Sequence, residues 1–136
     1  MGESTELLAA QLETKAIASV WSGTVWIPRL QLAEFARTSV AAIDKWVADG
    51  RLFGLTLDGE SYFPRYALDE RYQPMDVISH VLRIFQGENS NMSVAAWFES
   101  TSGFLRGARP RELVSIDSDL VVAAARNSLE NERYAG

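Results

Sequence analysis

The sequence predicts a mainly α-helical protein with one small β-hairpin. Apolar residues recur at helical spacing in several segments, and Asp58-Gly59 lies between two short runs in which apolar and polar residues alternate. The 136 residues are 47% hydrophobic and include four tryptophans, which is enough apolar surface to form a core. We therefore expect one compact body with two functional ends.

The first helix is expected near the N-terminus, where Leu8, Leu12, Ala16 and Val20 recur every four positions. Charged residues lie between them, so the helix has one apolar stripe. The stripe can cover the core of the same chain, or it can contact a second copy in a homodimer.

The charge distribution and the cysteine content indicate the cellular compartment and the kinds of partner. The chain has no cysteine, acidic residues stand where a secretory signal would carry lysine or arginine, and no stretch reaches membrane-spanning length. We expect a cytoplasmic protein without membrane contact. The net charge is -5 and no segment is basic overall, so long-range attraction to nucleic acid is missing.

The stretch that Pro28 opens predicts two short helices. Pro28 begins the first helix, Arg37, Thr38 and Ser39 form a three-residue turn, and Ser39 also caps the second helix. Gly50 ends that second helix. Apolar faces on both helices at 3.6-residue spacing are typical of a helix-turn-helix.

A hairpin is expected directly after the two helices. Asp58-Gly59 favours a two-residue turn, so residues 52–64 should form a hairpin that Pro64 ends. Residues 27–69 thus resemble the winged helix-turn-helix of excisionases and MerR-type regulators, in which a Gly-Arg-Leu step leads from the second helix into the wing. Here that step is Gly50, Arg51 and Leu52.

The second half of the chain predicts further helices. They cover residues 74–86, 93–100, a short segment from Pro110, and 117–130, with a loop over residues 87–91. We divide the chain into an N-terminal helical arm (1–25), a winged helix-turn-helix (26–72), a connecting helix and loop (73–89), and a small helical domain (90–136).

Nothing in the sequence predicts an enzyme. His80 is the single histidine, and it lies inside a regular helical run. The chain has no glycine-rich phosphate loop, no HExxH, no nucleophile elbow and no carboxylate pair at metal-ligand spacing. We predict no catalysis, no cofactor and no metal.

The case for DNA binding is mixed. The fold would place the second helix in a major groove, yet residues 40–49 offer Lys45 as their one cation, and Asp44 and Asp49 would repel phosphate. The alternative is a winged helix that serves as scaffold. The candidates, mostly as phosphate contacts, are Arg37, Thr38, Ser39, Lys45, Arg51, Tyr62 and Arg65.

The segment 97–114 concentrates aromatic and arginine residues. Trp97 and Phe98 are adjacent on a helix, so they point about 100° apart and cannot share one narrow buried stripe. Gly103 and Gly107 permit a tight turn around Phe104 and Leu105, and Pro110 starts the next helix. The pattern fits an internal core turn and an exposed contact surface equally well.

Residues 93–130 resemble the C-terminal toxin-binding domain of Xre/MbcA/ParS antitoxins. The matching positions are Trp97, Leu105, Gly107, Pro110, Leu113 and Val114. Members of this family neutralise toxins, often RES-type enzymes that consume NAD, by placing this region at the active-site cleft, and many repress their own operon. The chain departs from the family in its winged N-terminal half and in its second helix, which is poor in base-reading side chains.

The resemblance implies the antitoxin of a type II toxin-antitoxin pair, with a cognate protein toxin and operator DNA as partners. The alternatives are a stand-alone MerR or excisionase-like DNA-binding regulator, and an interaction module without a cognate toxin. The predicted toxin contacts are Trp97, Phe98, Phe104, Leu105, Arg106, Gly107, Arg109, Pro110, Arg111 and Leu113.

Overall fold

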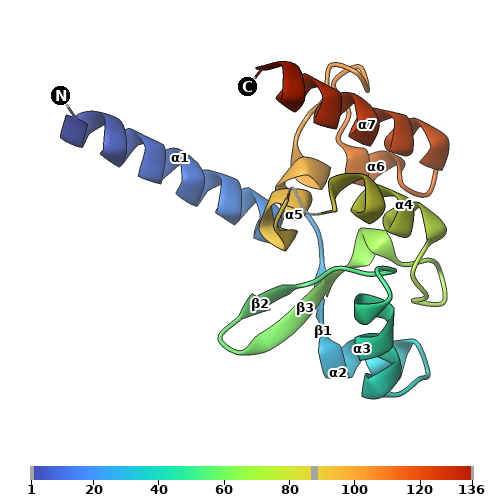
Figure 1. Ribbon diagram of the computed structural model, residues 1–136. Coiled ribbons are helices and arrows are strands. Elements are labelled where there is room, and N and C mark those ends of the chain that lie inside the picture. Colours follow the sequence, from blue (N-terminus) through green and yellow to red (C-terminus); the bar gives the residue numbers. More distant parts are fainter. Residues whose placement is uncertain (1, 87–88, 136) are drawn as a thin grey trace.

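A computed structural model describes residues 2–86 and 89–135 of the chain (Figure 1). The protein is mainly helical and has one small antiparallel sheet, which confirms the predicted fold class. No helix over these residues is long and apolar enough to cross a bilayer.

Helix α1 (Gly2–Ser22) projects from the body as an arm, and its last turn packs against α5 (Asn91–Glu99) (Figure 1). Val20 is buried, and its carbonyl accepts a hydrogen bond of 2.9 Å from Trp26 Nε1. Leu8 and Ala16 on the predicted stripe are exposed, whereas the side chain of Leu12 lies outside the described ones. The arm is therefore anchored at one end.

Two short helices, α2 (Arg29–Phe35) and α3 (Val40–Ala48), form the predicted helix-turn-helix. Ser39 caps α3, because its hydroxyl accepts a hydrogen bond of 3.1 Å from Ala42 N. Gly50 follows the helix with a φ of 73°, a conformation that glycine adopts without strain. The predicted turn, cap and helix end are all confirmed.

Strands β2 (Leu55–Leu57) and β3 (Glu60–Pro64) form the predicted hairpin, here called the wing. Leu57 pairs with Glu60 across a two-residue turn, and Asp58 and Gly59 both have positive φ. A third strand, β1 (Trp26–Pro28), pairs with β3 and gives the order β1-β3-β2. The sequence did not predict β1, because three residues carry too little periodicity to show a strand.

The other helices form a layer beside the sheet: η1 (Arg65–Ala67), α4 (Asp76–Phe85), α6 (Pro110–Leu113) and α7 (Ser118–Ala135). Helix α4 packs along α7, and α6 contacts α5, α7 and η1. Pro74 does not begin α4 as predicted, because it forms an isolated β-bridge with Leu68. Of the loop predicted over 87–91, residues 87 and 88 lie outside the described residues.

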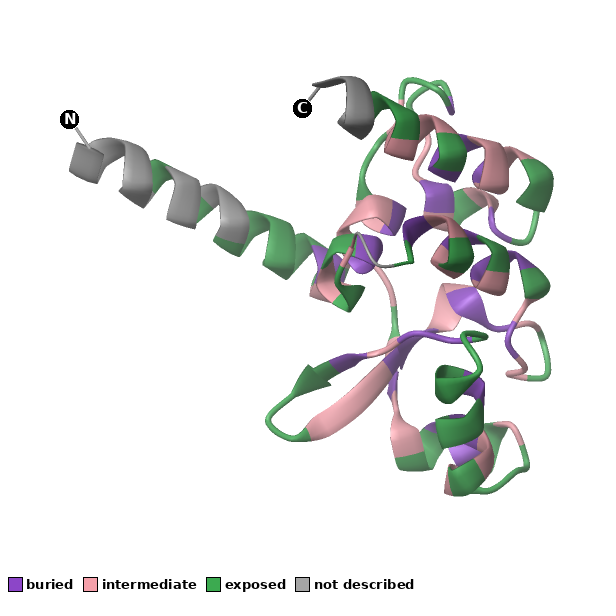
Figure 2. Ribbon diagram, in the orientation of Figure 1, coloured by how far each residue is buried: buried purple, intermediate pink, exposed green. Residues whose placement is uncertain are grey.

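One continuous core runs from the last turn of α1 to α7 (Figure 2). Phe53, which follows the helix-turn-helix, stacks on Phe98 of α5 with ring centroids 5.7 Å apart. Tyr66 of η1 packs against both rings. Buried residues from all four predicted segments contribute to this core, so the winged helix-turn-helix and the C-terminal helices form one body.

Candidate nucleic-acid interface

Helix α3 buries one face and leaves the other free. Ile43 and Trp46 pack into the core, whereas positions spaced by three and four residues on the opposite side are exposed. The outward stripe consists of Ala41, Asp44, Lys45 and Ala48.

Asp44 on this stripe is paired with Arg29 of α2. The Arg29 guanidinium donates from Nε to Asp44 Oδ1 at 2.7 Å and from Nη2 to Asp44 Oδ2. These hydrogen bonds lower the pKa of Asp44 and raise the pKa of Arg29. Lys45 Nζ lies 3.7 Å from Asp49 Oδ2. Both carboxylates that should repel phosphate therefore have a cation beside them.

Exposed cations lie before and after α3. Arg37, Thr38 and Ser39 are exposed, and so is Arg51 beyond the end of the helix. Arg71, in the loop after η1, is a further exposed cation that is not among the DNA contacts predicted from the sequence.

The loop that carries Arg71 packs against this turn. The rings of Phe35 and Tyr72 lie 5.0 Å apart, and Gln73 Nε2 donates to Ala36 O at 3.5 Å. No local spacing in the sequence indicates this contact, because the two segments are more than 30 residues apart.

Two of the predicted DNA contacts are turned inward. Arg65 donates from Nη1 to the carbonyls of Leu68 and Asp69, at 2.8 and 3.2 Å, and its guanidinium lies over the Tyr72 ring. Tyr62 is half-buried and packs edge-on against Trp21. Their positions assign Arg65 and Tyr62 to the internal structure of the wing and its adjoining loop.

The wing presents hydroxyl groups on the side that faces α3. Thr56 and Ser61 are directly paired across the hairpin, and both line a cleft of about 230 Å³ together with Asp44 and Val47. Hydroxyl side chains commonly donate to phosphate oxygens. The period-two alternation of the strands could have identified this pair, since Thr56 and Ser61 fall on one face.

In the segment 97–114, three of the ten predicted toxin contacts are buried. Phe98 is 0% exposed, Leu105 is 5% exposed and Pro110 is buried. Trp97 is half-buried, with its ring 5.2 Å from that of Phe85. Leu113 is also half-buried. The three buried side chains have no surface to offer a partner, so they shape the segment from inside.

Two arginines of this segment are bound internally. Arg111 donates to the Glu99 carboxylate at 2.6 and 3.2 Å, and these hydrogen bonds raise its pKa. Arg109 Nε donates to the main-chain carbonyl of Glu99 at 2.8 Å. The Glu99 side chain is 12% exposed, and a Cβ on Gly23 would lie 2.1 Å from its Oε2. The two arginines thus brace the start of α6 against the end of α5.

The turn over residues 102–108 is held by hydrogen bonds between Ser102 and the main chain of Gly107 and Ala108, at 2.8 and 3.1 Å. Gly107 has a φ of 88°, as a glycine turn requires. Gly103 was predicted to shape the turn as well, but its φ is not positive and it does not need to be glycine. Phe104, 44% exposed, and Arg106 remain at the surface.

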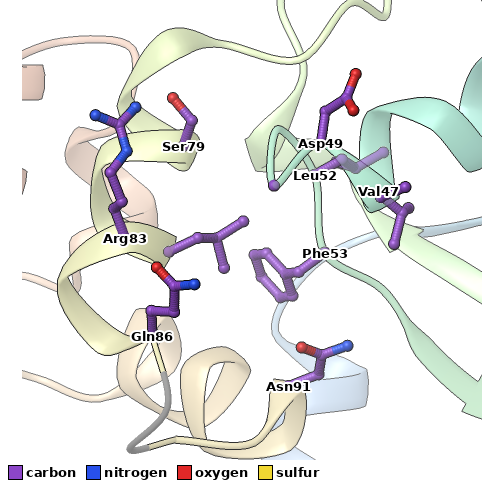
Figure 3. A pocket seen from close by; sticks show the side chains of 11 residues that line it. Val47, Asp49, Leu52, Phe53, Ser79, Arg83, Gln86 and Asn91 are labelled. Carbon is purple, nitrogen blue, oxygen red and sulfur yellow. The ribbon is translucent and has the colours of Figure 1, made fainter.

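The structure offers no catalytic constellation in its described residues. His80 is exposed on α4, and no three potential metal ligands from the described part of the chain come together. A cavity of about 370 Å³ separates α4 from the end of α3 (Figure 3). Asp49 and Arg83 are the only charged groups among the described residues that line it, and Ser79 lies one helical turn before Arg83 on α4.

The fold defines this chain as a winged helix-turn-helix protein with a helical C-terminal region. A solved structure described as the NMR structure of Rv2175c is similar, with a TM-score of 0.69 over 79% of this chain and 82% of that one. The two sequences are 16% identical, so the similarity concerns the fold alone. No family model and no curated protein matches this chain.

Proposed function

We propose that this chain is a DNA-binding protein that acts through its helix-turn-helix and has no enzymatic activity. The observation that supports the proposal most is the set of exposed cations around α3. Arg37 lies in the turn before the helix, Arg71 lies in the loop that packs against the end of α2, Lys45 is on the outward stripe of α3, and Arg51 follows its end. Meanwhile Arg29 neutralises Asp44, the acidic group that would face phosphate.

In this proposal α3 enters the major groove and the surrounding cations contact phosphates on either side. Ala41 and Ala48 make few base contacts, and the stripe carries no side chain with two matched hydrogen-bonding groups. Most of the affinity then comes from phosphate neutralisation. We expect modest sequence preference and steep salt dependence, with about one unit of slope for each phosphate contacted.

Fluorescence anisotropy with a labelled duplex, titrated at several KCl concentrations, tests this function. Arg37→Ala and Arg51→Ala should each weaken binding to all duplex sequences and reduce the salt slope by about one. Arg126→Ala removes an exposed cation of α7 and serves as the matched control. The proposal fails if binding is independent of salt, or if Arg126→Ala weakens it as much as the other two.

A second candidate is the antitoxin function that the sequence resemblance implies. The turn over residues 102–108 supports it, since this turn fixes Phe104 and Arg106 at the surface. An exposed aromatic beside an arginine is a common interface anchor. In this version a protein toxin contacts Phe104 and Arg106, and the buried residues of segment 97–114 hold the turn in place.

Co-expression with the product of the neighbouring gene tests the antitoxin candidate. We expect rescue of growth and a co-purifying complex that Phe104→Ala weakens, whereas Ile116→Ala, at another exposed apolar residue, leaves it intact. Absence of both rescue and complex rejects the candidate in favour of a stand-alone regulator or a module without a toxin.

Both proposed functions, DNA binding and toxin neutralisation, imply a cytoplasmic protein. A second copy of the chain is a further proposed partner, through α1, and sedimentation equilibrium would detect it.

A further inference from the structure

A groove lies between α2 and the tip of the wing, outside the stripe of α3. It has a volume of about 560 Å³. Leu30 and Gln31 of α2 form one wall, and Leu57 and Tyr62 of the wing form the other. Tyr62 was also predicted from the sequence to contact DNA. In the structure it lines this groove, and its ring packs edge-on against Trp21.

The apolar side chains of the groove are unusually exposed. Leu30 is 65% exposed and Leu57 is 48% exposed. Leu55 and Leu57 lie on one face of β2, but Leu55 is buried at the base of the wing, whereas Leu57 is beyond the edge of the core. Single exposed leucines are common, but two that line one groove from separate elements suit an apolar anchor of a partner.

All charged residues that line the groove are acidic. They are Glu34 on α2 and Asp58 and Glu60 on the wing. None of the three has a salt bridge to a cation among the described residues. Arg29 interacts electrostatically with Glu60, but its guanidinium is hydrogen-bonded to Asp44 of α3.

This charge pattern decides what the groove can accept. A phosphate backbone would meet three carboxylates and no cation, so nucleic acid is unfavourable there. Helix α1 of a second copy is also unfavourable, because its sequence carries Glu3, Glu6 and Glu13 against one lysine, Lys15. A positively charged segment with apolar residues is the complementary ligand.

We propose that this groove binds a basic amphipathic segment of a partner protein. Apolar side chains of the segment pack between Leu30 and Leu57, and its lysine or arginine side chains pair with Glu34, Asp58 and Glu60. This is the helix-in-groove mode of peptide recognition, with anchors spaced by three or four residues. The interaction is independent of the DNA-binding proposal, because it uses the opposite charge on a different surface.

Two synthetic helical peptides of one pattern test the proposal. Both carry leucine on one face, and their other positions carry lysine in the first peptide and glutamate in the second. In a ¹⁵N-¹H titration of the full chain, the lysine peptide should shift the amide signals of residues 30–34 and 57–62. The glutamate peptide should shift neither set.

Site variants separate a specific groove from general attraction to an acidic protein. The double variant Leu30→Ser, Leu57→Ser should lower affinity for the lysine peptide by roughly tenfold or more. Ile116→Ser, at a site 77% exposed in the C-terminal region, should leave it unchanged. Glu34→Gln with Glu60→Gln should also weaken binding and reduce its salt dependence, without a change in the free energy of unfolding large enough to explain the loss.

Four results would overturn the proposal. The peptide shifts could fall outside the groove, or the double serine variant could bind as well as the parent. Sedimentation could instead show a dimer that the double serine variant abolishes, which would make the groove an interface between copies. A duplex that shifts residues 57–62 would make it a DNA surface. Arg37→Ala distinguishes the two proposals, since it should impair DNA binding and leave peptide binding intact.

Discussion

Two arginines of the helix-turn-helix, Arg37 and Arg51, and two of segment 97–114, Arg109 and Arg111, have different environments. Arg37 and Arg51 extend into solvent without an ion pair to any described residue. Arg109 and Arg111 converge on Glu99, whose side chain is 12% exposed. The same side chain is thus available to an anionic ligand in one region and is an internal brace in the other. A carboxylate within reach decides between the two roles.

The aromatic residues of segment 97–114 show the same division within one segment. Phe98 is fully buried against Phe53, whereas Phe104, six positions later, is 44% exposed. A dense run of aromatics and arginines can therefore contain both core and surface residues. The turn between residues 102 and 108 is the part of this segment that exposes a large apolar side chain, Phe104.

Phe98→Ala should give the largest effect and most directly tests the division between core and surface. Removing a fully buried ring should lower the free energy of unfolding by about 3–5 kcal/mol. Phe104→Ala in the same segment should cost less than about 0.5 kcal/mol. Urea unfolding followed by circular dichroism measures both. Equal losses for the two variants would contradict the assignment of Phe98 to the core.

Glu99→Gln tests the internal brace. Glutamine keeps one oxygen acceptor but removes the negative charge that Arg111 and Arg109 share in a partly shielded site, so we expect a loss of about 2 kcal/mol after allowing for solvent screening. Glu130→Gln removes an exposed carboxylate of α7 and should be nearly neutral. If Glu99→Gln is also neutral in urea unfolding, the pairs contribute as little as surface ion pairs.

The features that the sequence predicted correctly depend on short-range chemistry. Ser39, Gly50 and the Asp58-Gly59 pair each act within a few residues, and the structure has the cap, helix end and hairpin turn at those places. The mainly helical class followed from periodicity in the same way.

The features that the sequence did not predict depend on contacts between distant segments. Arg111 reaches Glu99 across 12 positions only because the turn at Gly107 folds α6 back on α5. Arg71 comes to the helix-turn-helix through the contact of Tyr72 with Phe35. No local spacing indicates such pairs, so the arginines appeared equivalent in the sequence.

Gly107→Ala tests whether this turn is fixed by its backbone. A residue with a Cβ at a φ of 88° is strained, so we expect a loss of about 1–2 kcal/mol in urea unfolding. Gly103→Ala is the matched control, because its φ is not positive and nothing lies within 4 Å of the added Cβ. A neutral Gly107→Ala would indicate that the turn adapts, which would weaken the case for a preformed contact at Phe104.

Tyr66→Phe tests the interior beside the Glu99 brace. The Tyr66 hydroxyl is buried and has no hydrogen-bond partner among the described residues, so its removal should stabilise the protein by about 1 kcal/mol. Burial, and then the charge of Glu99, raise the pKa of Tyr66. The titration of Tyr66 therefore leaves folding stability unchanged below the ordinary tyrosine pKa of about 10, and lowers it as pH rises from there towards the folded value, because the unfolded chain loses the proton first. The advantage of Tyr66→Phe in unfolding free energy should grow above pH 10, and a constant difference would contradict this.

Asp44→Ala should have the smallest effect on stability and completes the comparison with Glu99. Both carboxylates bind an arginine through two hydrogen bonds, but the side chain of Asp44 is 54% exposed. Solvent screens such a pair, so the unfolding free energy at neutral pH should barely change. Arg29 lowers the pKa of Asp44, so the small contribution of the pair is present above the ordinary pKa of aspartate and is lost as pH falls through the lowered value.

The effect of Asp44→Ala on DNA binding should be larger than its effect on folding, because the substitution removes a negative charge from the stripe of α3 and frees Arg29. Affinity for duplex DNA should rise, and the salt slope should steepen by about one. If anisotropy shows unchanged affinity and slope, the outward stripe of α3 does not face DNA, and the exposed cations around it serve another ligand.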